Sequence, residues 1–415
     1  MTKGDFMNTL VYLSDYPHCF EPLLNYRDIH KVLIVEEGTT TEQQHLYFDE
    51  IHTVSSMLRL DEFEAIFTNL ASLGTIQAII VPDEDYVAIG GYLRSKFNIP
   101  GLNEQQTRNV RDKFVMKELV RAAGINGCYS VSIQDPDELP EHIVHIGYPV
   151  IVKPVDGAGT AHTYRLNSQA DLDNYLQSYR KQWRQIVVEP FIEGKEFHCD
   201  SIIVDGEVVF SSVGEYLFNC LDVVNKKGPL GMIIYPASAD SIPHIRAIKE
   251  MNTQVVKTLG ITKSVCHSEM FLQPSGKLYF GEIGARVGGG QIIPPCVRNS
   301  YGFDLLQTLV DLEMGQWKLE LQEKPGVYTG VICFPSRQGI VRNISKPDDF
   351  RDFPGIIQAR IFNKPGDQLN DMTNTMTRTG LAVAEGDCLE QVRERLMNVY
   401  SAFVLEVEHE TLINL

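Results

Sequence analysis

The chain has 415 residues, 43% of them hydrophobic and 22% charged, which is typical of a folded globular protein but too long for one ordinary core, so we expect about three domains. The net charge of −17 disfavours binding of nucleic acid through the overall field. The N-terminus lacks the apolar core of a signal peptide, and no segment has the apolar length of a membrane span. The eight cysteines include no CxxC pair. We therefore expect a cytoplasmic protein with free thiols, and neither a zinc ribbon nor a disulfide framework.

The N-terminal part alternates short β-rich runs with helical patterns. Strands are predicted at Thr9–Leu13, Lys31–Val35 and Gln77–Val81, and helices at Asp61–Leu73 and Asp85–Phe97. This alternation predicts an open α/β layer. No G-x-G-x-x-G follows the first strand, so we expect a scaffold that offers part of a substrate cleft and no dinucleotide site.

A helical pattern from Glu104 to Ala123 is interrupted near Asp112-Lys113 and stops at Gly124. Taken alone, Lys113 is typical of a solvated lysine on a helix face.

A strand that ends in a lysine then leads into a glycine-rich turn. Tyr148–Pro154 is the predicted strand and contains Lys153, and His162–Leu166 is predicted to be the next strand. The turn between them includes Gly157, Gly159 and Thr160, and its backbone N–H groups can form an anion-binding nest. The sequence lacks the GxxxxGK[ST] pattern of a P-loop. The turn therefore either covers phosphates in another way or is an ordinary hairpin loop.

An extended linker is predicted after a helix that runs from Asn167-Ser168 to about Arg180 and a strand at Ile186–Val188. Its peptide groups can hydrogen-bond an adenine edge, while apolar side chains pack on the faces of the base. An acid beyond it, Glu196, can accept from ribose hydroxyls. The linker residues are Glu189, Pro190, Phe191 and Ile192.

Two β-hairpins are predicted in the second half of the chain, one over 201–212 around Asp205-Gly206 and one over 270–280 around Pro274–Lys277. Antiparallel pairing in the second hairpin would bring Glu269 and Glu282 together, and two such carboxylates need a cation between them. Carboxylate oxygens suit Mg²⁺. The alternative is a surface hairpin with solvated acids.

An arginine and a glycine run follow the second hairpin. Arg286 can form a planar clamp for an anion, and Gly288–Gly290 lets a ligand approach the backbone closely. Cys266 and His267 are neighbours in a predicted strand, so their side chains point to opposite faces and no Cys–His nucleophile is expected. For His267, a satisfied buried position and a substrate-orienting role both stay open.

These motifs occur in one order and at compatible spacing, and the chain from about residue 1 to 320 resembles the ATP-grasp superfamily of ligases. The resemblance implies two α+β subdomains that close on ATP, with Mg²⁺ (or Mn²⁺) bridging phosphates and acids. It implies that Lys113 and Lys153 contact the phosphates, that Glu189 and Glu196 flank the nucleoside, and that Glu269 and Glu282 hold the metal.

One departure points to a branch of that superfamily. Gly284 stands where most members have an Asn whose amide oxygen binds metal, so water or a bidentate Glu282 would fill that position. The runs His267–Glu269 and Glu282–Gly289 resemble the L-amino acid ligase branch, in which Gly also occupies this place. Lys227-Gly228-Pro229 resembles that branch's substrate loop, and Tyr328–Leu415 its accessory domain.

The predicted organisation is of mixed α/β and α+β class, with an ATP-grasp fold at its centre. We expect an N-terminal open parallel-sheet domain over 1–105, an ATP-grasp domain over 106–325 with a lid at about 125–190, and a C-terminal accessory domain over 326–415.

The chemistry implied is activation of a carboxylate as an acyl phosphate, followed by attack of an amine or a thiol. Arg286 and the N–H groups of the glycine run, with Gly289 at its centre, are the candidates to stabilise the tetrahedral oxyanion. A substrate-orienting role for His267 completes the catalytic set. The acceptor is either an amino acid amine or the phosphopantetheine thiol of an acyl carrier protein.

A carrier protein would need a basic docking patch. A non-catalytic nucleotide-binding regulator would not need both lysines, both acids and Arg286. A homodimer stays open. The residues that could form the docking patch are Arg180, Lys181 and Arg184, or Arg393 and Arg395.

Overall fold

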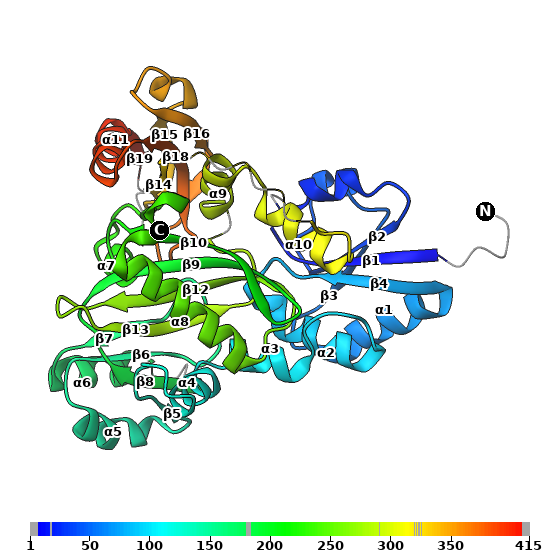
Figure 1. Cartoon of the computed structure of the whole chain (residues 1–415), viewed down its shortest axis with the longest axis horizontal. Coiled ribbons are helices and arrows are strands. Elements are labelled where there is room, and N and C mark those ends of the chain that lie inside the picture. Colours follow the sequence, from blue (N-terminus) through cyan, green and yellow to red (C-terminus); the bar gives the residue numbers. More distant parts are fainter. Residues whose placement is uncertain are drawn as a thin grey trace, which may run out of the picture.

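The structure is a computed structural model, and it describes residues 7–16, 19–179, 184–289, 291–318, 320, 322, 324 and 326–408. The described strands form four sheets, which confirms the expected mixed α/β and α+β class. In Figure 1 the N-terminal layer lies to the right, the small lid sheet lies at the lower left, and the C-terminal part rises at the upper left.

The N-terminal layer is a parallel sheet in the order β3-β2-β1-β4, flanked by helices. The predicted strands and helices of this region are confirmed. The strand β3 was not predicted because its sequence, EIHTV, has three polar residues and only Val54 is fully buried. The elements are β1 (Met7–Leu13), η2 (Glu21–Asn25), β2 (His30–Glu36), η3 (Glu42–Leu46), β3 (Glu50–Val54), α1 (Leu60–Leu73), β4 (Gly74–Ile80), η4 (Glu84–Tyr86) and α2 (Val87–Phe97).

The helical region after this layer is divided at Asp112, as expected, into α3 (Glu104–Arg111) and α4 (Lys113–Ala122). The Asp112 carboxylate accepts hydrogen bonds from the N–H groups of Phe114 and Val115, both at 3.0 Å, and so caps the second helix. Lys113 is therefore the first residue of α4. It is buried, in contrast to the solvated position that is typical of such a lysine taken alone.

The lid is an antiparallel sheet in the order β5-β8-β6-β7 with its own small core. The strand and helix predictions here are confirmed to within a few residues; Arg180 lies outside the described residues. The elements are β5 (Val131–Ile133), η5 (Pro136–Glu138), α5 (Leu139–Ile146), β6 (Val150–Pro154), β7 (Tyr164–Leu166), α6 (Gln169–Tyr179) and β8 (Ile186–Pro190).

An eight-stranded sheet, in the order β13-β12-β9-β10-β11-β14-β18-β16, forms the centre of the molecule. Both predicted hairpins lie in it, and Glu269 is paired with Glu282 in the ladder. The elements up to the end of the second hairpin are β9 (Lys195–Val204), β10 (Glu207–Tyr216), α7 (Cys220–Lys226), β11 (Gly231–Ile234), η7 (Ala237–Ser241), α8 (Pro243–Leu259), β12 (Ser264–Leu272) and β13 (Leu278–Gly284).

The strand β11 pairs with β14, so the sheet crosses the predicted domain boundary at residue 326 and continues into the C-terminal part. The domain boundaries given above stay predictions. The C-terminal part also contains a separate three-stranded sheet in the order β17-β15-β19. The remaining elements are α9 (Ile293–Tyr301), α10 (Leu305–Glu313), β14 (Tyr328–Pro335), β15 (Gly339–Ile344), η8 (Pro347–Phe350), β16 (Ile356–Ile361), β17 (Gln368–Leu369), β18 (Arg378–Gly386), α11 (Leu389–Ala402) and β19 (Leu405–Glu408).

The chain returns to the N-terminal layer after β13, where α10 packs against β4 (Figure 1). A buried ion pair joins the two regions: Arg94 Nη2 lies 3.1 Å from Glu313 Oε1, and the two side chains are only 5% and 4% exposed. The same Nη2 donates a 2.5 Å hydrogen bond to the carbonyl oxygen of Ile79. None of the described helices is both long and apolar enough to cross a membrane.

Removing one partner of this ion pair should destabilise the protein strongly. Glu313→Ala leaves the Arg94 guanidinium buried without its charge partner, and the expected loss in the free energy of unfolding is about 3–5 kcal/mol. Urea denaturation followed by fluorescence measures it. Asp348→Ala removes the exposed ion pair with Arg351 and should cost less than about 1 kcal/mol. Equal effects of the two substitutions would contradict the role given to Arg94 and Glu313.

Candidate active site

Two neighbouring cavities open between the lid, α4 and the β12–β13 hairpin. The first has a volume of about 130 Å³ and is lined by the lid, the predicted linker and the start of α7. The second has a volume of about 120 Å³ and extends toward the N-terminal layer and the segment before β18. Lys113, Glu269 and Glu282 line both cavities. These three predicted site residues therefore lie where the two spaces meet.

The two predicted phosphate lysines lie at this boundary. Lys153 Nζ is 3.6 Å and Lys113 Nζ is 3.8 Å from Glu282 Oε2. Lys113 also donates to the carbonyl oxygen of Gly157 in the glycine-rich turn. Burial lowers the pKa of Lys113. Burial alone would raise the pKa of Glu282, but the two lysines lower it. The lysines thus hold an ionised Glu282 in a mostly enclosed site.

Glu189 lines the first cavity, and its place beside a nucleoside stays a prediction. Its carboxylate lies between two lysines: Lys153 Nζ is 2.9 Å from Oε1, and Lys117 Nζ contacts Oε2. Sequence analysis missed Lys117, whose side chain is only 1% exposed. A signal was present, because Lys117 follows Lys113 by one helical turn and the two side chains share a helix face.

Pro190, the last residue of β8, lines the first cavity together with Phe191 and Ile192. The strand thus runs two residues further than predicted, and the linker begins at Phe191. The N–H of Phe191 is already bonded to the carbonyl oxygen of Pro149 at 3.0 Å, so it is not available to a base. The N–H of Ile192 makes no hydrogen bond to a described residue. The Arg165 guanidinium lies 3.8 Å from the centroid of the Phe191 ring. A flat apolar surface and one free donor are therefore present where the sequence predicts the adenine.

Glu196 and Glu269 lie close together in the wall of the first cavity. Their carboxylate oxygens and the Cys220 sulfur lie within 4.8 Å of one another. Burial is the main cause of the raised pKa of Glu196, and the charge of Glu269 raises it further. Glu196 also accepts a 2.7 Å hydrogen bond from the N–H of Cys220, which begins α7. No motif marks Cys220, and sequence analysis missed its contribution to the cavity.

Glu269 and Glu282 offer the oxygen atoms that a hard divalent cation prefers. They are paired across β12 and β13 and line both cavities. The close approach of Glu196 to Glu269 is a concentration of negative charge that a cation would relieve. The residues present therefore fit Mg²⁺ or Mn²⁺.

The glycine-rich turn is joined to the C-terminal part of the chain. Gly159 and Thr160 have positive φ values of 60° and 62°, and the carbonyl oxygen of Gly159 accepts two hydrogen bonds from Thr375. The Thr375 N–H donates at 3.0 Å and its Oγ1 at 3.2 Å. Gly157, Gly159 and Thr160 all line the second cavity, and Gly157 and Thr160 also line the first.

Arg286 is oriented by an acid from the N-terminal layer, which sequence analysis did not foresee. Its Nε lies 2.5 Å from Glu84 Oε2, and Arg111 Nη1 lies 2.7 Å from Glu84 Oε1. Burial would raise the pKa of Glu84, but Arg286 and Arg111 lower it to about 2. Arg286 lines the second cavity, and its Nη2 has no hydrogen bond to a described residue.

The glycine at position 284 has a structural cause. A Cβ atom on Gly284 would lie 2.6 Å from Glu84 Oε2, so a side chain there would displace the carboxylate that holds Arg286. Glu84 occupies the space that the side chain of an Asn at position 284 would need.

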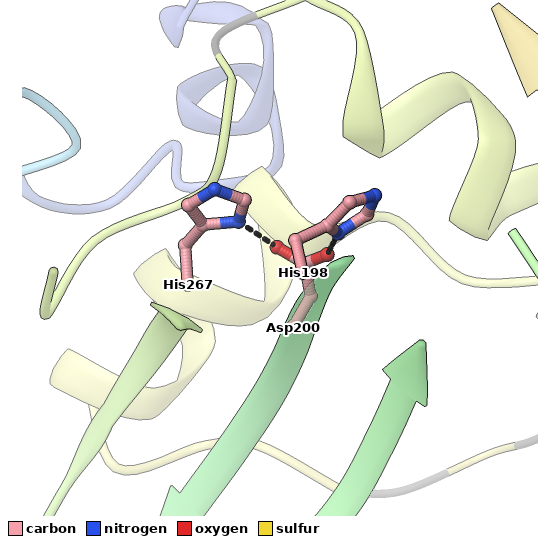
Figure 2. A group of neighbouring side chains, drawn as sticks. All are labelled: His198, Asp200 and His267. Atoms are coloured by element: carbon pink, nitrogen blue, oxygen red, sulfur yellow. Dashed lines mark hydrogen bonds and ion pairs between the residues drawn. The ribbon is translucent and has the colours of Figure 1, made fainter. Parts of the chain in front are cut away.

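His267 belongs to a buried group of three side chains, shown in Figure 2. Asp200 lies between two histidines: its Oδ1 is 2.8 Å from His267 Nδ1, and its Oδ2 is 2.6 Å from His198 Nδ1. The His267 Nε2 is 3.5 Å from both the Tyr216 hydroxyl and Glu269 Oε1. Burial lowers the pKa of His267, but Asp200 and Glu269 raise it to about 9. The side chain is satisfied and buried, and it also lines the second cavity.

The neighbouring positions agree with this arrangement. A Cβ atom on Gly288 would lie 2.5 Å from both Asp200 Oδ1 and His267 Nδ1, so only glycine fits there. Gly289 has a φ of 56° and lines the second cavity, whereas Gly290 lies outside the described residues. Cys266 is buried in the core on the other side of β12, as expected, and forms no pair with His267.

Comparisons with known proteins agree with this geometry. Residues 146–295 match the ATP-grasp domain family, and residues 331–408 match the L-amino acid ligase C-terminal domain 2. The L-arginine-specific L-amino acid ligase of Bacillus subtilis is 25% identical over 333 residues, which cover 78% of each chain. Dapdiamide A synthase of Enterobacter agglomerans is 24% identical over 336 residues, covering 75% of this chain and 76% of that protein.

Solved structures show the same fold. The L-amino acid ligase of Bacillus licheniformis superposes with a TM-score of 0.77 at 16% identity, over 98% of this chain and 100% of that one. The N5-carboxyaminoimidazole synthetase of Staphylococcus aureus, solved with ADP, superposes with a TM-score of 0.69 at 16% identity over 97% of this chain and 100% of that one. The chain therefore combines an ATP-grasp domain with a region similar to the C-terminal domain 2 of the L-amino acid ligases.

Proposed function

We propose that the protein activates an amino acid carboxylate with ATP and joins it to the amine of a second amino acid, releasing ADP and phosphate. The observation that carries this proposal is that the two cavities share Lys113, Glu269 and Glu282 as walls. A nucleotide in the first cavity would place its terminal phosphate against a substrate in the second. We take amino acids as the substrate class because two of the relatives described above are L-amino acid ligases.

The first step is transfer of the γ-phosphoryl group. A carboxylate oxygen of the substrate attacks the γ-phosphorus, and the bond to the bridging oxygen breaks to release ADP. Such a transfer needs positioning and neutralisation of charge more than covalent help. Lys113 and Lys153 supply that charge, and the N–H groups of the glycine-rich turn can cover the phosphates. Glu189 and Lys117 hold Lys153 and the adjoining wall in place.

Glu269 and Glu282 would hold the Mg²⁺ or Mn²⁺, which neutralises phosphate charge when bound. The chain's own residues otherwise bind and orient the substrates. In the proposed arrangement the N–H of Ile192 meets the adenine edge, Phe191 packs against the base, and Glu196 accepts from the ribose.

The second step is attack of the amine on the acyl carbon. The amine nitrogen forms the new bond to the acyl carbon, and its proton passes to the departing phosphate. The bond between the acyl carbon and the phosphate oxygen breaks as the tetrahedral oxyanion collapses. Arg286, held by Glu84, and the N–H of Gly289 are proposed to stabilise that oxyanion. Asp200 fixes the ring of His267, which is proposed to orient the substrate through Nε2.

A thiol acceptor on an acyl carrier protein is less well supported by the surface. Arg393 is paired with Glu215, and Arg395 donates to the carbonyl oxygen of Glu385, so neither is free to form a docking patch. Of the other predicted patch, Arg180 and Lys181 lie outside the described residues and Arg184 is exposed. We therefore favour the amine.

The proposal is tested by measuring ADP and phosphate release with all amino acids, singly and in pairs, with and without hydroxylamine. Hydroxylamine traps an acyl phosphate whatever the natural acceptor is. We expect ADP release that depends on an amino acid and gives a hydroxamate when hydroxylamine is present. The absence of ADP release under every condition would contradict the proposal.

Glu282→Gln should abolish most turnover while nucleotide binding persists. The variant loses a metal ligand worth several kcal/mol to the transition state, so we expect turnover to fall by about 100-fold or more. The linker that faces the base is untouched, so calorimetry should still detect ADP binding in the absence of metal. Glu193→Gln is the matched control, because Glu193 is exposed just after the linker and is not among the residues that line either cavity. Turnover close to wild type in Glu282→Gln would refute the metal assignment.

Arg286→Ala should lower kcat by about two orders of magnitude, the typical effect of losing one oxyanion donor. Arg286→Lys keeps the charge but loses the planar fork, so it should recover only part of the loss. ATP affinity should barely change in either variant, because Arg286 lines the second cavity and not the first. Steady-state ADP release at saturating carboxylate and calorimetry measure the two quantities. If ATP binding falls in proportion to activity, Arg286 is a nucleotide ligand or a structural residue instead.

A further inference from the structure

The segment of residues 370–378, here called the C-terminal loop, touches three parts of the proposed active site. It joins β17 to the first residue of β18. Thr375 bonds the Gly159 carbonyl oxygen in the glycine-rich turn, and Asp371 lies 2.7 Å from Lys227 in the predicted substrate loop. Met376 and Arg378 line the second cavity. A segment more than two hundred residues away in sequence therefore completes the substrate space.

The C-terminal loop is held in one shape by its own hydrogen bonds. Asn374 Oδ1 accepts from the N–H of Met376 at 2.9 Å, and from the N–H and hydroxyl of Thr377 at 3.0 and 3.1 Å. Ser336 Oγ donates to the carbonyl oxygen of Asn370 at 2.7 Å. Side chains on such a pre-organised segment lose little freedom when a ligand binds.

Arg378 differs from the other cationic side chains of the second cavity. Lys113 faces Glu282, Arg286 is bonded to Glu84, and His267 to Asp200. Within the part of the chain that the structure describes, Arg378 has no carboxylate within ion-pair distance. Its Nη1 donates a hydrogen bond to the sulfur of Cys333 at 3.6 Å. A partly buried guanidinium without an acid is a binding site for an anion with planar oxygen pairs.

The position of Arg378 decides which anion this is. Arg378 lines the second cavity but not the first, so the nucleotide is not its partner. The carboxylate that becomes activated must lie near Lys113 and Glu282, where the cavities meet. The remaining anion in a condensation of two amino acids is the α-carboxylate of the amine substrate.

We propose that Arg378 binds the α-carboxylate of the acceptor amino acid and so directs its amine toward the acyl carbon. This inference rests on the proposed ligase function. Because Thr375 joins the same loop to Gly159, the acceptor site is complete only when the glycine-rich turn lies against the C-terminal loop.

The test compares two acceptors that differ only at the carboxylate. The probes are the acceptor amino acid that gives the fastest ADP release in the screen, and its carboxamide. For the wild type we expect a KM for the acid about 10- to 100-fold below that for the amide, the effect of one charge-assisted hydrogen-bond pair. Arg378→Ala should remove this preference, and Arg378→Lys should restore part of it. Arg337→Ala, at an exposed arginine, is the matched control and should keep the preference.

Two outcomes would overturn the proposal. The first is a wild type that forms hydroxamate yet has the same KM for acid and amide. The second is an Arg378→Ala variant, or an Arg378→Lys variant if Ala impairs folding, that keeps the preference or raises the KM for ATP instead. A wild type that neither releases ADP nor forms hydroxamate with any amino acid would contradict the ligase function itself.

Discussion

The site depends on a network of ion pairs, most of them buried, in which each ion is held by another. Glu189 lies between Lys117 and Lys153, and Lys153 and Lys113 both face Glu282. Buried ions are costly unless they are paired and hydrogen-bonded, so none of these side chains can be removed without leaving its partner uncompensated. This network of ion pairs contains three lysines and only two acids. The surplus positive charge is suited to phosphate, which makes the same network a structural element and the proposed nucleotide site.

The parts of the chain outside the ATP-grasp region complete that site. The N-terminal layer delivers Glu84 just beyond the end of β4, and Glu84 sets the direction of Arg286. The C-terminal loop reaches the glycine-rich turn through Thr375. The second cavity is therefore built by three regions that are far apart in sequence. Its shape and charge, and hence the choice of substrates, depend on how those regions pack together.

Local sequence patterns predicted much of the fold and part of the site. The hairpin around Pro274–Lys277 placed Glu269 opposite Glu282, because turn residues act on their neighbours. The helical pattern was interrupted near Asp112-Lys113, and α4 begins there. Long-range partners had no such signal. Glu84 reaches Arg286 across 202 positions, and Thr375 reaches Gly159 across 216. Lys117 lay between these cases, since helical spacing from Lys113 indicated its direction but not its partner.

The most direct test of the central claim follows a carboxylate oxygen of the substrate. The donor amino acid is labelled with oxygen-18 in its carboxylate and incubated with the enzyme, ATP, Mg²⁺ and the acceptor, and the products are analysed by mass spectrometry. An acyl phosphate pathway transfers a labelled oxygen to inorganic phosphate, with ADP as the other product. Phosphate without label, or label in AMP together with pyrophosphate, would show a different mode of activation and contradict the mechanism.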